Sequence, residues 1–393
     1  MPSSTARTRP GFLIASAAFN LSFTMLLVLV PLFAAKRGYD LAAIGLLAAV
    51  PGLLQIPLRV SGGVLADVWG SPRIMRICFV ASAVAVVPLL VPAPSLAGLA
   101  FAQICNGIAR GGFWPAAQAH ASRSSGDPAR AISLLFSVTG IGAIIALLAA
   151  GGLADGLGFR AAFAASGAAA LIALVATLRQ PSPARPRAAL RVGTVLGPLR
   201  RLIVQRPFLV AGALAFAASV PNALAGSFYP VFALQLGFGA VLATALVALR
   251  QGGNIVGATF FTPLLDRLGY SRTVRGGLVA VALSLVAVPL LRNPVLYAAG
   301  LALSGIAGQV VNVAYIWFAT KSSRPEERGS ALAATGLWWA AAVLLAPAIF
   351  GAVAARIGIP ATFVVTGALV AALAAALSLQ PLWLRAPVPG QAD

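Results

Sequence analysis

The sequence predicts an all-α integral membrane protein with twelve transmembrane helices, arranged as two repeated halves of six. Three observations lead to this fold class. The 393 residues are 60% hydrophobic and only 9% charged, with a mean hydropathy of +0.94, whereas an ordinary soluble domain has about 25% charged residues. Long apolar runs follow one another along the chain. A group of residues in the first half is repeated 199 positions later in the second; Asp67, for example, corresponds to Asp266.

The apolar runs set the number of helices. Each run is about 20 residues or longer, which is enough to cross the roughly 30 Å hydrocarbon core of a bilayer as a helix. Internal Gly and Pro are tolerated in such helices, because neighbouring helices satisfy the freed backbone groups. We predict twelve spans, at residues 12–35, 41–66, 74–92, 96–119, 131–154, 161–179, 207–233, 240–264, 276–292, 295–319, 330–355 and 361–384.

The basic residues orient these spans through the positive-inside rule. With a cytoplasmic amino terminus, twenty of the 28 Lys and Arg residues fall on the inner side, and Arg59, Arg110 and Arg250 fall within spans. We therefore predict a multi-pass protein of the cell (inner or plasma) membrane with both termini in the cytoplasm. Five basic residues remain on the outer side: Lys36, Arg37, Arg160, Arg292 and Arg356.

A basic segment separates the two halves. The stretch from Arg179 to Arg206 carries seven arginines, four prolines and no acidic residue, which is typical of a solvated connector attracted to anionic headgroups. We predict a six-helix bundle at 1–179, a cytoplasmic basic linker at 180–206 and a second six-helix bundle at 207–393.

The repeated motif lies between the second and third spans and again between the eighth and ninth. This acid-x-x-Gly-x-x-Arg pattern resembles a loop that the major facilitator superfamily repeats at the same two places, although Val68 stands where the family usually has a basic residue. The resemblance implies two six-helix bundles related by a pseudo-twofold axis, with a substrate site between them near the membrane midplane. The gating residues that it implies are Gly63, Asp67, Gly70, Arg73, Asp266, Arg267, Gly269 and Arg272.

The two acidic residues of the motif are candidate latches. A carboxylate is stabilised beside the positive end of a helix dipole. By the resemblance, Asp67 would contact the start of the eleventh span near Gly329, and Asp266 the start of the fifth near Ala131, so that the cytoplasmic side is held shut. The alternative interpretation is that both acids only cap loops.

Polar side chains inside the spans form stripes at helical spacing and are the candidate substrate-binding residues. A buried arginine costs at least about 2.5 kcal/mol, so it should face protein or water. Since no span centre holds Asp or Glu, a cavity lined by guanidinium groups should attract anions; alternatively, the arginines bond backbone carbonyls or membrane-edge groups structurally. The candidates are Asn20, Gln55, Arg59, Gln103, Asn106, Arg110, Asn222, Tyr229, Arg250, Asn254, Gln309 and Asn312.

Other function classes lack their motifs. The sequence has no Gly-x-x-x-x-Gly-Lys-Ser/Thr loop and no Gly-x-Ser-x-Gly, so we expect neither ATP-driven transport nor an enzyme. Cys78 and Cys105 lack metal-ligand spacing, and we expect no metal and no cofactor. The basic residues that give the net charge of +20 lie mainly between apolar spans and form no recognisable nucleic-acid-binding module. No nucleic-acid partner is therefore expected.

We therefore expect a monomeric secondary transporter of a small organic solute that works by alternating access, with a modest preference for anionic or amphipathic substrates. Export is favoured by analogy with compact twelve-helix efflux permeases. The expected partners are the substrate, the lipid bilayer and a coupling ion if transport is ion-driven; Gln103 and Leu147-Leu148 replace two family marks of proton antiport.

Three alternatives remain open. The first is a small-anion porter or facilitator, because Arg59, eight residues before Asp67, resembles the substrate-binding arginine of nitrate/nitrite porters. The second, from another class, is a non-transporting membrane receptor or scaffold. The third is a membrane-bound enzyme, which would need acidic or histidine side chains converging at the membrane surface.

Overall fold

The computed structural model describes residues 10–124, 127–178, 201–323 and 328–379, and most of the predicted linker, residues 180–200, lies outside these ranges. The described residues are helical and contain no strand. The first half holds α1 (Pro10–Lys36), α2 (Leu41–Trp69), α3 (Ser71–Val86), η1 (Val87–Leu89), α4 (Leu96–Ser124), α5 (Pro128–Gly156) and α6 (Phe159–Leu178). The second half holds α8 (Arg206–Ala225), α9 (Phe228–Gln235), α10 (Ala240–Ala287), η2 (Val288–Leu290), α11 (Pro294–Lys321) and α12 (Arg328–Leu379).

These helices account for the twelve predicted spans and confirm the fold class. Nine helical stretches of the described chain are long and apolar enough to cross a membrane. Two of them, in α10 and α12, each join two spans across a glycine with non-helical backbone angles, Gly269 and Gly358. With these two counted double and with the 29-residue α4 added, the nine stretches become twelve spans.

One predicted span is broken. The run at 207–233 forms two helices, because α8 ends at Ala225 and α9 begins at Phe228. A proline clashes with the carbonyl four residues before it and cannot donate to it, and Pro230 stands four residues after Gly226. The equivalent Pro31 lies inside the unbroken α1, where Leu27 occupies the place of Gly226, so proline breaks the helix here only in combination with glycine.

The internal repeat is visible in the backbone. Six glycines of the described chain have φ between 74° and 87°, a region that side chains with a Cβ rarely adopt. They form three pairs separated by 199, 199 and 200 residues, so the helix connections at which they stand are the same in both halves. The pairs are Gly38 with Gly237, Gly70 with Gly269, and Gly158 with Gly358.

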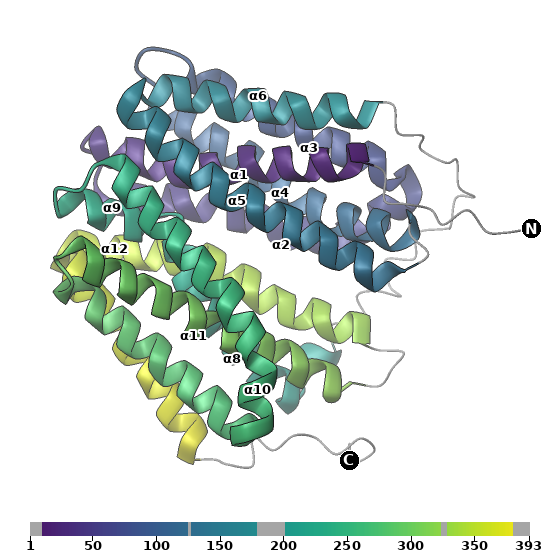
Figure 1. The fold of residues 1–393 in the computed structure, drawn as a ribbon, viewed down its shortest axis with the longest axis vertical. Coiled ribbons are helices and arrows are strands. Elements are labelled where there is room, and N and C mark those ends of the chain that lie inside the picture. The colour runs from purple at the N-terminus through teal and green to yellow at the C-terminus, as the bar shows by residue number, and fades with distance from the viewer. Residues whose placement is uncertain (1–9, 125–126, 179–200, 324–327, 380–393) are drawn as a thin grey trace, which may run out of the picture. The chain divides into compact units, whose positions relative to one another are not determined.

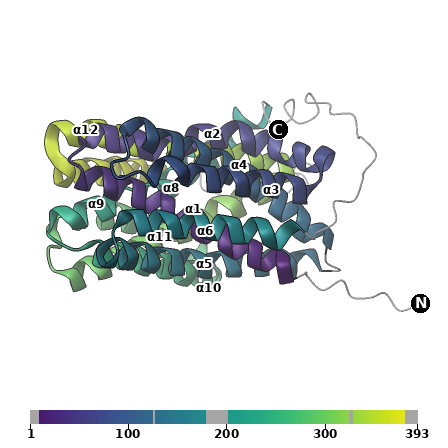
Figure 2. The same ribbon diagram turned by 90° about the horizontal axis from the view of Figure 1, so that it is seen from above.

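The chain forms two compact units, and each takes a short piece of the other sequence half. The first unit comprises Met1–Tyr39, Val50–Leu190 and Ala233–Ala245; the second comprises Asp40–Ala49, Arg191–Phe232 and Leu246–Asp393. Within the first unit, α1 packs against α5 and α6, and α3 packs against α4 and α6 (Figure 1). Within the second, α8 packs against α11 and α12. Figure 2 shows that the helices of each unit run along a common direction.

The short segment that each unit takes from the other sequence half packs against that unit through glycines, and the two contacts occupy equivalent positions in the repeat. In the second unit, a Cβ added at Gly45 of α2 would lie 2.8 Å from the Cα of Gly351 in α12. In the first unit, a Cβ added at Gly151 of α5 would lie 2.7 Å from the Cα of Val241 in α10 and would collide with Thr244. Small residues allow such close backbone approach between membrane helices. Gly45 and Thr244 are 199 residues apart, and Gly151 and Gly351 are 200 apart, so the two helix crossings are copies of one another.

Candidate functional site

In the first unit, buried amide side chains lie on α2 and α4, two helices that pack against each other. Gln55, Gln103 and Asn106 are all fully buried. The helices approach closely because α4 has glycine at 107 and 111; a Cβ at Gly107 would lie 2.9 Å from the Cα of Pro51. The Nδ2 of Asn106 donates to the Oε1 of Gln103 at 3.4 Å, and the Nε2 of Gln55 donates to the carbonyl of Pro51 at 3.1 Å. The side-chain oxygens of Gln55 and Asn106 are buried and accept no hydrogen bond from the described residues.

Two further first-unit candidates are held by neighbours. The guanidinium of Arg110, one turn beyond Asn106, lies over the ring of Phe23 with its carbon 4.5 Å from the centroid, a geometry in which the cation is attracted to the aromatic face. The amide of Asn20 on α1 donates to the backbone carbonyl of Thr139 on α5. Arg110 therefore has an aromatic partner, and Asn20 joins two helices.

The second unit brings Arg250 and Asn222 together. Arg250 of α10 is 2% exposed, and its Nη1 donates to the Oδ1 of Asn222, on α8, at 2.9 Å. Its Nε and Nη2 are buried and make no hydrogen bond to a described residue. A Cβ at Gly308 of α11 would lie 3.7 Å from Nη2, an ordinary contact distance, so Gly308 packs beside the guanidinium.

Tyr229 completes this second-unit group, which we call the Arg250 cluster (Arg250, Asn222, Tyr229). Tyr229 is fully buried, its ring stacks on Phe363 with centroids 5.2 Å apart, and its hydroxyl lies 3.4 Å from that of Ser304. Arg250 and Tyr229 also interact electrostatically. A buried arginine, an amide and a phenol hydroxyl therefore face one another inside one unit.

The remaining second-unit candidates do not join the cluster through any described hydrogen bond. The Nδ2 of Asn254 donates to the Oε1 of its neighbour Gln251 at 3.0 Å, and its Oδ1 is buried without a partner among the described residues. Gln309 and Asn312 of α11 are half-buried. Gln55 and Asn254 are equivalent under the repeat, yet their hydrogen bonds differ.

Several sequence-predicted residues carry no side-chain description. Arg59, Gly63 and Asp67 lie on α2, but the surroundings of these three residues are outside the described part of the structure. The predicted latch at Asp67 therefore also lies outside it. Gly70 and Gly269, with φ of 83° and 74°, each provide the turn between two helices. The charged side chains of the remaining predicted gate are all exposed: Arg73, Asp266, Arg267 and Arg272.

Sequence reasoning missed some residues of these groups. Ser304 is one, because a hydroxyl in a membrane helix ordinarily bonds its own backbone and gives no distinctive pattern. Thr139 is another, because it takes part through its backbone carbonyl, a group that every residue has. Trp338 of α12 was also missed, although its indole Nε1 is buried without a partner among the described residues and its ring packs on Gly212. The sequence does carry a signal for Trp338: it lies within a predicted span, where the N–H of an indole usually finds an acceptor.

No group of three or more His, Cys, Asp or Glu side chains that could hold a metal ion occurs within the described ranges. Cys78 and Cys105 are both buried and reduced. The residues of these sites offer hydrogen bonding and charge: amides in one unit, and a guanidinium with an amide and a phenol in the other.

Twelve apolar spans and an all-helical structure define a multi-pass membrane protein with the fold of a transporter. The model of the Major Facilitator Superfamily matches residues 12–291 and 222–393. The chain therefore belongs to the Major Facilitator Superfamily.

Solved structures agree on the fold. The nucleoside transporter NupG superposes with a TM-score of 0.76 at 17% identity, over 94% of this chain and 99% of that one. A bacterial homologue of the human lysosomal transporter Spinster, inward-facing and occupied, gives 0.75 at 17% identity, over 96% of each chain. A POT family transporter in complex with 5-aminolevulinic acid gives 0.77 at 12% identity, over 95% of this chain and 96% of that one. No curated protein matches the sequence.

Proposed function

We propose that this protein is a secondary transporter of a small organic solute that works by alternating access and prefers anionic or amphipathic molecules. Membership of the superfamily and the similarity to transporters of nucleosides and peptides support a small organic cargo. The preference rests on the Arg250 cluster, as set out below.

The guanidinium of Arg250 is the observation that carries the proposal. A guanidinium has five N–H donors in a planar fork suited to carboxylate and phosphate. Here Nη1 is bonded to Asn222, whereas Nε and Nη2 are buried with no described acceptor. A buried donor left without an acceptor costs about 1–3 kcal/mol, and more for a charged group. An anionic substrate group would remove that cost by accepting both hydrogen bonds.

We expect transport to require two helix crossings, each between helices of different sequence halves, to separate and re-form. The crossing of α2 with α12 at Gly45 and Gly351, and that of α5 with α10 at Gly151 and Thr244, each join helices from the two sequence halves. In our proposal, these two equivalent crossings loosen when the site opens on one side. The gating residues around Gly70 and Gly269, with Asp67 and Asp266 as latches, would act at the opposite end of the same helices.

The proposed direction is export from the cytoplasm by a monomer with cytoplasmic termini. The short connections at the predicted outer side support it, since only four residues separate α1 from α2 and four separate α9 from α10. Transport into and out of inverted membrane vesicles measures this direction separately from the substrate preference.

Counterflow in proteoliposomes tests the proposal. Vesicles loaded with an organic anion should accumulate labelled anion through the wild-type protein and less labelled organic cation. Substituting Arg250→Gln removes the charge-assisted bonds, which are worth about 1.5–3 kcal/mol, and should weaken anion affinity at least about tenfold. Equal counterflow of anions by the variant and the wild type would contradict the proposed substrate preference.

A second variant separates binding from folding. Arg250→Met replaces a buried charge by an apolar side chain of similar length, and it leaves the Oδ1 of Asn222 without its donor, which costs about 1–3 kcal/mol. The variant should still unfold in a cooperative thermal transition, yet show no stabilisation by organic anions. Arg292→Gln, which removes an exposed charge at the start of α11, is the control and should leave anion binding unchanged.

A further inference from the structure

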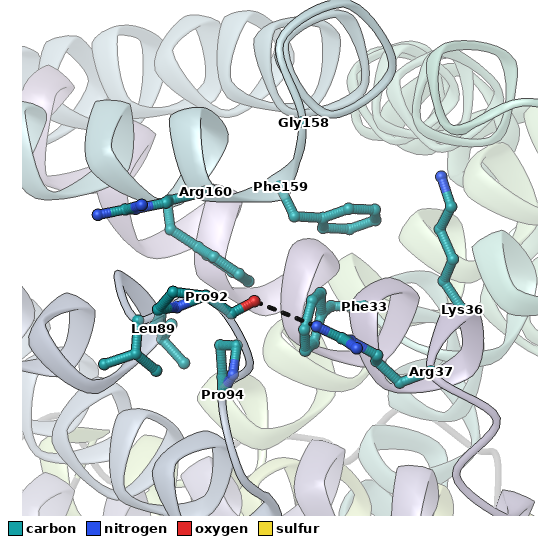
Figure 3. Close-up of a pocket in the computed structure, with 11 residues that line it drawn as sticks. Phe33, Lys36, Arg37, Leu89, Pro92, Pro94, Gly158, Phe159 and Arg160 are labelled. Carbon is teal, nitrogen blue, oxygen red and sulfur yellow. Dashed lines mark hydrogen bonds between the residues drawn. The ribbon is translucent and has the colours of Figure 1, made fainter.

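The first unit holds a cavity of about 440 Å³ at one end of α1 (Figure 3). It lies between the end of α1, the connection from η1 to α4, and the start of α6. Phenylalanine rings form part of its wall: Phe33 lies 5.4 Å from Phe159 and 5.9 Å from Phe163, between ring centroids. By the charge rule that orients the chain, this end of the unit is the outer one.

Three exposed cations, Lys36, Arg37 and Arg160, line the cavity, and no lining residue is acidic. Figure 3 shows Lys36 and Arg160 on opposite sides of the rings of Phe33 and Phe159. The Nζ of Lys36 lies 5.5 Å from the Phe159 centroid, and the guanidinium of Arg37 lies 5.2 Å from the Phe33 centroid. The Nη2 of Arg37 also donates to the carbonyl of Pro92 at 3.2 Å. Three of the five basic residues predicted on the outer side thus gather at one cavity.

The second half of the chain shows that the fold does not require these charges. The aromatic pair of Phe33 and Phe163 returns as Phe232 and Phe363, with centroids 6.0 Å apart. The cations and the ring of Phe159 have no counterparts in the second half. At an offset of 199 residues, Gln235 and Leu236 stand in the places of Lys36 and Arg37; at an offset of 200, Ile359 and Pro360 stand in the places of Phe159 and Arg160. The rings common to both halves serve packing, whereas the charged positions are peculiar to this cavity.

We propose that this cavity binds the phosphate group of an anionic amphiphile, with the apolar part of the molecule against the phenylalanine rings. Arginine forks match phosphate oxygens in pairs. The α6 helix begins at Phe159, so the positive end of its dipole adds to the three cations. The volume lies in the range of small-molecule sites. The phosphate can come from a lipid of the facing leaflet or from a soluble phosphate ester, and the site is independent of the transport substrate proposed above.

Binding to the purified full-length protein in neutral detergent tests this site. The probes are phosphatidylglycerol, phosphatidylcholine and glycerol 3-phosphate, and the readouts are bound mass in native mass spectrometry and thermal stability. Retained phosphatidylglycerol with no response to glycerol 3-phosphate would identify a lipid source, and a response to glycerol 3-phosphate alone would identify a soluble source. Either result supports the site, provided that the variants below remove it.

The variants neutralise one or all three of the cations that line the cavity. Lys36→Gln should weaken phosphatidylglycerol binding about fivefold, the effect of one basic residue at a membrane surface, and the triple variant Lys36→Gln, Arg37→Gln, Arg160→Gln should abolish specific retention. The control is Arg292→Gln with Arg356→Gln, which removes two charges from the same predicted face outside the cavity. Equal loss in the control, equal retention in the triple variant, or equal binding of phosphatidylcholine would overturn the proposal.

Discussion

The carboxylate of Asp155, in the last turn of α5, accepts a hydrogen bond at 2.8 Å from the backbone N–H of Val241, in the first turn of α10. Both residues belong to the first unit. A helix begins with N–H groups that have no partner in their own helix. At the start of α2 such a group is capped within the helix, because Asp40 accepts from the N–H of Ala43. At the start of α10 the cap comes from another helix, so it also joins α5 to α10.

Asp155→Ala should loosen this contact. Loss of an N-cap costs about 0.5–2 kcal/mol, and since Asp155 is exposed we expect the lower half of that range, about a two- to eightfold shift toward separated helices. The measurement is the rate at which a maleimide labels Ala240→Cys, a position that is 3% exposed, in a background where Cys78 and Cys105 are replaced by Ala. The rate should rise by that factor.

The matched control for this prediction is Asp40→Ala. It removes an equal cap from the repeat-equivalent helix, but this cap lies within its own helix and joins nothing. It should leave the labelling of position 240 unchanged, and an equal rise in both variants would mean that the Asp155 contact does not link α5 to α10.

The internal repeat indicates that the start of α10 lacks a cap of its own. At 199 residues from Asp40, the capping position before α10 is Gly239, which has no side chain to cap with. A Cβ at Gly239 would lie 2.8 Å from the Oδ2 of Asp155, so the missing side chain is what admits the carboxylate. The sequence therefore indicated that α10 needs a cap from elsewhere, but only the fold shows that α5 supplies it.

The rest of the fold shows the same contrast: features set by neighbouring residues could be predicted from the sequence, whereas contacts between distant residues could not. Composition, apolar runs and the repeat were enough to predict all twelve spans, because hydrophobic length is a local property. The break at Gly226 depends on a glycine placed four residues before a proline, which the apolar run conceals. The partners Arg250 and Asn222 were both singled out, but no helical spacing relates α8 to α10, so their pairing could not be predicted.

Tyr229→Phe should weaken anion binding without unfolding the second unit. The ring stack on Phe363 remains, and the hydroxyl beside Arg250 and Ser304 is lost. We expect anion affinity to fall about tenfold or less, the worth of a neutral hydrogen bond of about 0.5–1.5 kcal/mol. Equilibrium binding of a labelled organic anion measures this change.

The control for the tyrosine is Tyr297→Phe. The hydroxyl of Tyr297 donates to the backbone carbonyl of Tyr229 at 3.0 Å, so its loss should lower thermal stability while anion affinity stays near the wild-type value. Anion affinity that falls in Tyr297→Phe and not in Tyr229→Phe would remove the Tyr229 hydroxyl from the proposed site.

Arg110 and Phe23 should be energetically coupled. The guanidinium lies 4.5 Å from the ring centroid, and a desolvated cation–π contact is worth up to about 2 kcal/mol. A double-mutant cycle with Arg110→Gln and Phe23→Leu, read from the free energy of unfolding in a denaturant series, should give a coupling of about 0.5–2 kcal/mol. Strictly additive effects would show that the contact contributes nothing to stability.

Gly151 and Gly152 should respond in opposite directions to the same substitution. A Cβ at Gly151 would collide with Thr244 and lie 2.7 Å from the Cα of Val241, whereas a Cβ at Gly152 would meet nothing within 4 Å. Overpacking costs about 1–3 kcal/mol, and Ala in place of a helix-interior Gly favours the helix by about 0.5–1 kcal/mol. Gly151→Ala should therefore lower thermal stability and speed labelling of Ala240→Cys, while Gly152→Ala should raise stability and leave labelling unchanged. If both variants keep wild-type labelling, the α5–α10 crossing is not the contact that separates during transport.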